Sequence, residues 1–180
     1  MKNEKSKILV SACLVGAKVR YDGRHAWCGD QSFLQWMSEG RLLIFCPEVF
    51  SELTIPRDPM ELELKMISTY SPSQQIRVIN KNGVDFSQQF MKGVQRAVDL
   101  VKQNCIKVAV LKEYSPSCGV TRVYDGTFSG QIVNGQGVVA KALHQLGVVL
   151  FSENQISQAA EYIAELDSSK KVENNHDWCI

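Results

Sequence analysis

Lys7–Cys13 reads KILVSAC, a short run that is β-branched and apolar nearly throughout, as is typical of a buried β-strand. Arg41–Cys46 (RLLIFC), Lys107–Leu111 (KVAVL) and Val148–Phe151 (VVLF) have the same character. Strands that are apolar on both faces occur in parallel sheets covered by helices on both sides. These four segments therefore predict the centre of the fold.

Amphipathic segments alternate with the strands, and the clearest has apolar residues at intervals of three and four. The predicted helices are Asp30–Gly40, Asp85–Asn104, Gln136–Leu146 and a last one that Ser152 caps and that runs to about Leu166. Asp30 is expected to cap the first helix, and Gly147 to end the third. This alternation predicts a single α/β domain of three layers with a mainly parallel, Rossmann-like central sheet. We expect it to span residues 1–167, followed by a polar tail over 168–180.

The segment Glu48–Gln75 holds three of the five prolines and is expected to be mostly irregular, with a helical turn around Met60–Met66. A loop of that length inside a compact domain is usually functional. Ile76–Asn80 is predicted as a short strand and Tyr124–Gly130 as a turn.

The composition of the 180 residues is that of a globular protein, with 44% apolar and 22% charged residues. Lys and Arg number 20 against 19 Asp and Glu, a formal charge of +1, which excludes a strongly basic nucleic-acid binder and an acidic disordered chain. No apolar run approaches the roughly 20 residues of a membrane span. The apolar run before Cys13 is also short for a signal peptide, and Glu4 precedes it. We therefore expect a cytoplasmic protein with reduced thiols.

Three of the six cysteines follow predicted core strands. In an open α/β sheet, ligands bind beyond the carboxyl ends of the strands. Cys13 ends the first strand, Cys46 ends the second, and Cys118 lies in the loop after the third, so we expect them to converge. The other three have simpler explanations: Cys28 lies in a polar loop, Cys105 is a small buried hydrophobe at a helix end, and Cys179 is in the tail.

Three converging cysteines allow several interpretations. A zinc site lacks the usual C-x-x-C pair, and a catalytic thiol lacks an obvious histidine base. An iron–sulfur cluster would use thiolates as its natural ligands. The spacing alone favours a cluster and plain buried thiols about equally, with zinc behind them.

Polar side chains accompany these cysteines. Glu48 follows Cys46 and Pro47, and it is a candidate general acid or base. Ser115 and Ser117 precede Cys118. Taken singly, Glu48 could serve as a cap and the serines could make turn hydrogen bonds.

Five motifs, in this order, resemble the thiouracil desulfidase family, and the resemblance covers about residues 7–153. They are Val10–Gly16 (VSACLVG), Arg20–Gly23 (RYDG), Cys46–Glu48 (CPE), Leu111–Gly119 (LKEYSPSCG) and Tyr124–Gly130 (YDGTFSG). The resemblance implies an α/β domain that holds a [4Fe–4S] cluster on Cys13, Cys46 and Cys118.

The resemblance also implies an activity. The iron without a protein ligand would bind the sulfur of a small thiolated base such as 2-thiouracil, and water would replace that sulfur, which leaves as sulfide without net electron transfer. Glu48 would move protons for the attacking water, and Ser115 would orient the substrate or relay a proton. Ser11 and Ser117 are assigned to substrate contacts. The near-neutral charge favours a free base or nucleoside over an intact tRNA.

One segment departs from the family. Many relatives carry a glycine pair soon after the CPE motif, whereas this chain has bulkier residues over Val49–Ile55, which are expected to narrow or reshape the pocket. The alternative function is a binding or sensing module, in which a cluster or the thiols report oxygen or sulfur status without turnover. Such a sensor would not need Glu48.

Overall fold

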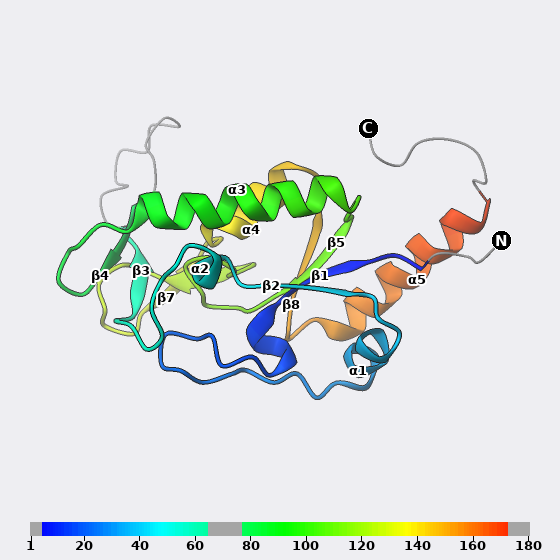
Figure 1. Cartoon of the computed structure of the whole chain (residues 1–180), viewed down its shortest axis with the longest axis horizontal. Coiled ribbons are helices and arrows are strands. Elements are labelled where there is room, and N and C mark those ends of the chain that lie inside the picture. Colours follow the sequence, from blue (N-terminus) through cyan, green and yellow to red (C-terminus); the bar gives the residue numbers. More distant parts are fainter. Residues whose placement is uncertain (1–4, 65–76, 173–180) are drawn as a thin grey trace.

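The structure, a computed structural model, describes residues 5–64 and 77–172. Its centre is a four-stranded sheet in which every neighbouring pair is parallel (Figure 1). The strand order is β2 (Leu42–Phe45), β1 (Ile8–Ser11), β5 (Val108–Leu111) and β8 (Val149–Ser152). The four segments of continuous apolar sequence thus form one parallel sheet, which confirms the predicted fold class.

Helices cover both faces of this sheet, as Figure 1 shows. Alternate strand residues divide between two cores: Ile8 and Val10 pack with one helix pair, and Leu9 packs with the other. The first pair is α1 (Gln31–Ser38) and α5 (Ile156–Val172), and the second is α3 (Ser87–Gln103) and α4 (Val138–Gln145). The three predicted layers are confirmed.

The helix ends follow the local sequence. The Asp30 side chain accepts hydrogen bonds from the backbone N–H groups of Ser32 (2.8 Å) and Phe33 (3.4 Å), so it caps α1 as predicted. Gly147 takes a φ of +78° just after α4, the left-handed conformation that ends many helices. The predicted helix cap at Ser152 is wrong, because Ser152 is the last residue of β8 and α5 begins only at Ile156; the Ser152 hydroxyl accepts the N–H of Asn154 in the turn between them.

Two features differ from the sequence predictions, and one predicted turn is confirmed within a hairpin. Met60–Leu62 is a strand (β3) rather than a helical turn, because it pairs antiparallel with β4 (Val78–Asn80), outside the central sheet. The predicted turn at 124–130 is the tip of an antiparallel hairpin, β6 (Arg122–Tyr124) and β7 (Ile132–Asn134). Pro47–Phe50 is a short helix, α2, within the segment expected to be irregular.

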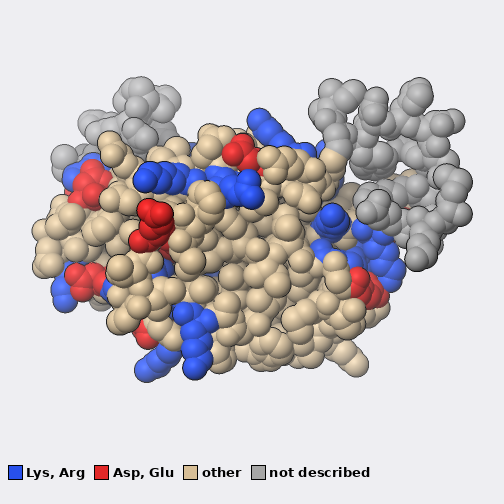
Figure 2. All heavy atoms as spheres, in the orientation of Figure 1, with Lys and Arg blue, Asp and Glu red and all other residues tan. Residues whose placement is uncertain are grey.

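The last helix is longer than expected. It continues to Val172, past the predicted boundary at residue 167, and Arg41 binds Asp167 at 2.8 Å, which ties this part of α5 to the sheet. The end of the predicted tail, with Cys179, and residues 65–76 lie outside the described residues. No helix in the described part of the chain has the length and apolar character needed to cross a membrane. On the face in Figure 2, Lys and Arg are interspersed with Asp and Glu.

Candidate functional site

A cavity of about 500 Å³ lies at the carboxyl end of the central sheet. Ser11 and Phe45, the last residues of β1 and β2, line it together with Lys112, which follows β5. Cys13, Cys46 and Cys118 all line this cavity too. The predicted convergence of the three cysteines is therefore present.

Cys13 lies in the single turn of 3₁₀ helix, η1 (Ala12–Val15), that follows β1. Gly16 ends the turn with a φ of +91°, a conformation that favours glycine. The Cys13 side chain is buried, and burial is the main cause that raises the pKa of its thiol from 9.0 to about 11; the nearby Cys46 raises it further.

Cys46 precedes α2 at its N-cap position, and Pro47 occupies the first turn of that helix, where the missing N–H costs nothing. Burial raises the pKa of the Cys46 thiol, while the backbone N–H groups of Val49 and Glu48 oppose this rise. Helix α3 packs closely here: a Cβ on Gly93 would lie 2.7 Å from the Pro47 carbonyl oxygen. Close packing of α3 thus sets the position of α2.

Cys118 lies in the loop that joins β5 to β6, and the first residues of α4 form hydrogen bonds with this loop. The N–H groups of Val138 and Val139 donate to the carbonyls of Pro116 and Ser117, both at 2.9 Å. A Cβ on Gly137 would lie 2.4 Å from the Ser117 carbonyl group, so only glycine fits there. Burial raises the pKa of the Cys118 thiol well above its ordinary range, although the Ser11 side chain opposes this with a hydrogen bond.

The three thiols are close enough to affect one another. The charges of Cys13 and Cys46 both raise the pKa of Cys118, in addition to burial. Three thiolates in one buried cavity repel each other unless a cationic group lies between them. No set of three or more His, Cys, Asp or Glu side chains in the described part of the chain is arranged to hold a single metal ion. Thiolates are the natural ligands of an iron–sulfur cluster, so the donor set of Cys13, Cys46 and Cys118 fits such a cluster.

Glu48 extends from α2 into the cavity and has two partners. One carboxylate oxygen pairs with the Arg57 guanidinium, and the other accepts a hydrogen bond of 2.8 Å from the Ser117 hydroxyl. Arg57 is itself buried and donates to the Thr54 and Val19 carbonyls. Glu48 is therefore an ion-paired carboxylate held on both oxygens, the form that accepts a proton.

The three serines of the predicted site differ in what they contact. The Ser115 hydroxyl oxygen lines the cavity and accepts the backbone N–H groups of Ser117 and Cys118, both at 3.1 Å. Ser117 is fully buried, lies outside the cavity lining and contacts Glu48. The Ser11 hydroxyl accepts a hydrogen bond from the N–H of Lys112 and forms another with the Cys118 thiol.

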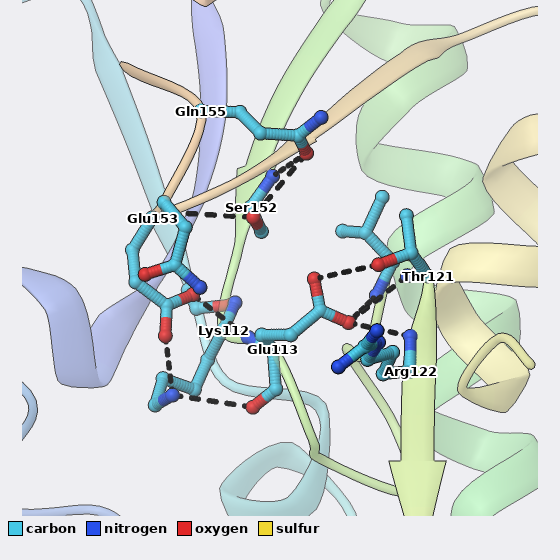
Figure 3. Close-up of polar contacts among 10 residues, drawn as sticks. Lys112, Glu113, Thr121, Arg122, Ser152, Glu153 and Gln155 are labelled. Atoms are coloured by element: carbon cyan, nitrogen blue, oxygen red, sulfur yellow. Dashed lines mark hydrogen bonds and ion pairs between the residues drawn. The ribbon is translucent and has the colours of Figure 1, made fainter. Parts of the chain in front are cut away.

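Sequence reasoning did not assign several charged residues of the cavity wall, among them Arg57, Glu61, Lys112 and Glu113. Glu61 and Glu113 are buried and accept backbone hydrogen bonds, and Arg57 holds Glu48. Lys112 pairs with Glu153, which also accepts the N–H of Glu113 (Figure 3). Arg57 lies between Pro56 and Pro59, and Glu61 follows them, so their place in the proline-rich stretch after the CPE motif was the available signal.

The residues of Val49–Ile55 do not line the cavity, so their side chains do not narrow it directly, and the expected reshaping stays a prediction. Val49, Phe50 and Ile55 are largely exposed instead. Glu52 has a φ of +61°, which shows why glycine is suited to this stretch: the backbone turns there in the left-handed region.

Two other cysteines are described. Cys28 is buried with a free thiol and lies outside the cavity lining, as expected of an incidental residue. Cys105 is disulfide-bonded, so the expectation of a reduced, buried thiol there is wrong. It follows α3 with a φ of +51°, and it is only half-buried.

Comparisons with known proteins agree with this geometry. Residues 8–155 match the family described as 2-thiouracil desulfurase. The Bacillus subtilis (strain 168) protein YbbK, described as uncharacterized, is 33% identical over 150 residues, covering 83% of this chain and 97% of YbbK. A solved structure of TudS, described as a [4Fe–4S]-dependent thiouracil desulfidase, superposes with a TM-score of 0.81 and 37% identity, covering 89% of this chain and 99% of that one. The chain thus belongs to the 2-thiouracil desulfurase family.

Proposed function

We propose that this protein is an iron–sulfur desulfidase that removes sulfur from a small thiolated base such as 2-thiouracil and releases it as sulfide. The observation that carries the proposal is the convergence of Cys13, Cys46 and Cys118 with Glu48 in one cavity. The family and the likeness to TudS support it.

Cys13, Cys46 and Cys118 would hold a [4Fe–4S] cluster. When bound, the cluster supplies a Lewis-acidic iron without a protein ligand, which suits the soft sulfur of a thiocarbonyl. The thiols line the cavity from three separate segments of the chain, and burial raises the pKa of each. Such thiols are poor isolated anions, and ligation to a cationic centre stabilises their thiolate form.

Glu48 moves the protons of the reaction. Replacement of C=S by C=O consumes one water and releases one H₂S, so two protons pass from the water oxygen to the sulfur. Glu48 accepts the two protons one after the other from the oxygen that adds to the ring carbon, and it passes each of them to the departing sulfur. Arg57 and Ser117 orient its carboxylate by binding one oxygen each.

Ser115 contacts the substrate. Its hydroxyl oxygen already accepts two backbone N–H groups, so its own proton is directed to a partner other than these amides. A donor at this position orients the base or passes a proton to it. Ser11 acts on a cluster ligand rather than on the substrate, because its hydroxyl forms a hydrogen bond with the Cys118 thiol.

The cavity suits a small molecule. Its volume of about 500 Å³ lies in the usual range for ligand sites, roughly 300–1,000 Å³, and planar rings from Tyr21, Tyr114 and Phe128 line it. The mixed charges of the visible surface favour a free base or nucleoside over a nucleic acid (Figure 2). We place the activity in the cytoplasm, the compartment that the sequence predicts.

The test is sulfide release by anaerobically reconstituted protein from a panel that contains 2-thiouracil, 4-thiouracil, 2-thiocytosine and thiourea. We expect sulfide from at least one thiolated base and none from thiourea, which lacks a planar aromatic ring. A protein that holds its cluster but releases no sulfide from any base would favour the sensing function instead.

A further inference from the structure

Two buried carboxylates in the cavity wall, Glu61 and Glu113, are not used by the proposed chemistry. Their exposed fractions are 8% and 4%. A buried carboxylate is stable only when it is paired or well hydrogen-bonded, and both accept hydrogen bonds from backbone N–H groups. Each therefore binds a loop rather than a ligand.

Glu113 closes the loop that carries Cys118. Its Oε1 atom accepts three consecutive N–H groups, from Val120 (3.1 Å), Thr121 (2.9 Å) and Arg122 (2.8 Å) (Figure 3). Successive amides that converge in this way form an anion-binding nest. The Glu113 side chain thus links the start of the loop to its end at Val120–Arg122. The loop between these points carries Ser115 and Cys118.

The same loop is fixed to the sheet by a second carboxylate. Glu153, just after β8, accepts the N–H of Glu113 at 2.8 Å and pairs with Lys112 (Figure 3). Tyr114, next in the chain, has a φ of +65°, an uncommon conformation for a bulky residue. Such a conformation persists only where the surroundings enforce it. The contacts of Glu113 and Glu153 supply that enforcement.

Glu61 binds a second segment of the cavity wall in the same way. Its Oε2 atom accepts the N–H groups of Gly126 (2.9 Å) and Phe128 (3.1 Å) at the tip of the β6–β7 hairpin. Phe128 lines the cavity with a φ of +57°. A Cβ on Gly126 would lie 2.5 Å from the Leu62 carbonyl oxygen, so the hairpin tip lies directly against β3. Glu61 thus holds an aromatic side chain in the cavity wall.

We propose that Glu113 and Glu61 are two separate positioning residues, Glu113 for cluster ligation by Cys118 and Glu61 for the aromatic wall that contacts the base. The Glu61 part rests on the proposed function. The Glu113 part requires only a bound cluster, so it is tested without turnover.

The experiment compares Glu113→Ala and Glu61→Ala in the reconstituted holoprotein, with Glu63→Ala as the matched control. Glu63 is a carboxylate two residues from Glu61 that pairs with Arg77 at the surface, so its loss has little effect. Two quantities are measured for each variant: the rate of iron transfer to a chelator under anaerobic conditions, and the separate kcat and KM for 2-thiouracil.

We expect Glu113→Ala to lose iron at least tenfold faster than the wild type. Glu61→Ala keeps the wild-type rate within twofold but raises KM at least fivefold, and Glu63→Ala changes neither quantity. Equal acceleration of iron loss in both buried-carboxylate variants would overturn the proposal, because it would show general destabilisation. A wild-type rate in Glu113→Ala would overturn it as well.

Conservative variants keep the test decisive if an alanine variant does not fold. Glu113→Gln retains an oxygen that can accept the three N–H groups but loses the charge. We expect it to lose iron about threefold faster than the wild type, and an unchanged rate contradicts the Glu113 assignment. Glu61→Gln is expected to raise KM about twofold with kcat unchanged; a drop in kcat alone contradicts the Glu61 assignment. Absence of turnover by the wild type would remove the proposed function and the Glu61 part, while the iron-transfer rates still decide the Glu113 part.

Discussion

The Ser117 hydroxyl donates a 2.8 Å hydrogen bond to Glu48 Oε1, across 69 positions of sequence. Glu48 follows the second strand of the sheet, and Ser117 lies in the loop after β5. This bond joins the two cysteine-bearing segments that contain Cys46 and Cys118. It also leaves Glu48 with a fixed direction toward the cavity, because Arg57 binds its other oxygen.

Ser117→Ala tests the positioning of Glu48. The variant leaves one carboxylate oxygen without its donor while it keeps Arg57 in place, so we expect kcat to fall about fivefold to tenfold with the cluster retained. The pH profile of kcat should change at the same time, since the proton-accepting group has lost a hydrogen bond. If the variant instead loses iron while its kcat per cluster is unchanged, Ser117 stabilises the loop that carries Cys118 and does not position Glu48.

Glu48→Gln tests the proton-moving role directly. We expect cluster content close to that of the wild type and a fall in sulfide release of about 10²-fold or more. The buried Arg57 loses its counter-ion in this variant, so its melting temperature must be recorded beside its activity. Turnover at the wild-type rate would remove Glu48 from the mechanism.

Alanine variants of the cysteines test the ligand set. Cys13→Ala, Cys46→Ala and Cys118→Ala should each abolish the brown colour and the iron content of the reconstituted protein. Cys28→Ala is the matched control, because its thiol is buried and free but lies outside the cavity lining. Full iron content in any of the first three variants would exclude that cysteine as a ligand. We expect Cys105→Ala and Cys179→Ala to keep the cluster.

Glu52→Gly tests the backbone of the segment that departs from the family. A left-handed conformation costs an L-residue roughly 1–2 kcal/mol, and glycine adopts it without that cost but with greater entropy in the unfolded chain. Glu52 has a φ of +61°, so we expect a net stabilisation of about 0.5–1 kcal/mol in urea unfolding. Its cluster content and kcat should not change, because the side chain is outside the cavity lining.

The thiols also predict how the stability of the cluster-free protein depends on pH. Burial raises the pKa of Cys13 from 9.0 to about 11 in the folded protein, so the folded state keeps a proton that the unfolded chain releases above pH 9. The contribution to stability is therefore complete below pH 9 and is lost as the pH rises toward 11, at up to about 1.4 kcal/mol per pH unit. Urea unfolding at pH 8 to 11 should show a smaller decline in Cys13→Ala. An equal decline in both proteins would show that Cys13 titrates normally.

The sequence predicted most of the sheet because its strands are buried on both faces, and such strands have an unmistakable apolar pattern. It placed Cys13, Cys46 and Cys118 together for the same reason, since the ends of parallel strands meet at one edge. It did not predict β3, because Met60–Leu62 is stabilised by hydrogen bonds to β4, whose paired residues lie 16 to 20 positions later in the chain.

The positioning network could not be predicted for a related reason. Glu61 and Glu113 look like ordinary surface carboxylates in the sequence, and their function depends on backbone N–H groups that the loops of the fold bring to them. The disulfide at Cys105 was also missed, because the cytoplasmic location that we predicted favours reduced thiols.

The most direct test of the account is the stoichiometry of 2-thiouracil consumption by the anaerobically reconstituted wild-type protein with no added reductant. Uracil and sulfide are measured in the same reaction. We predict one uracil and one sulfide for each 2-thiouracil consumed, over many turnovers per cluster. A protein with full iron content that forms no uracil, or that forms it only with a reductant present, would contradict the proposed hydrolytic desulfidase.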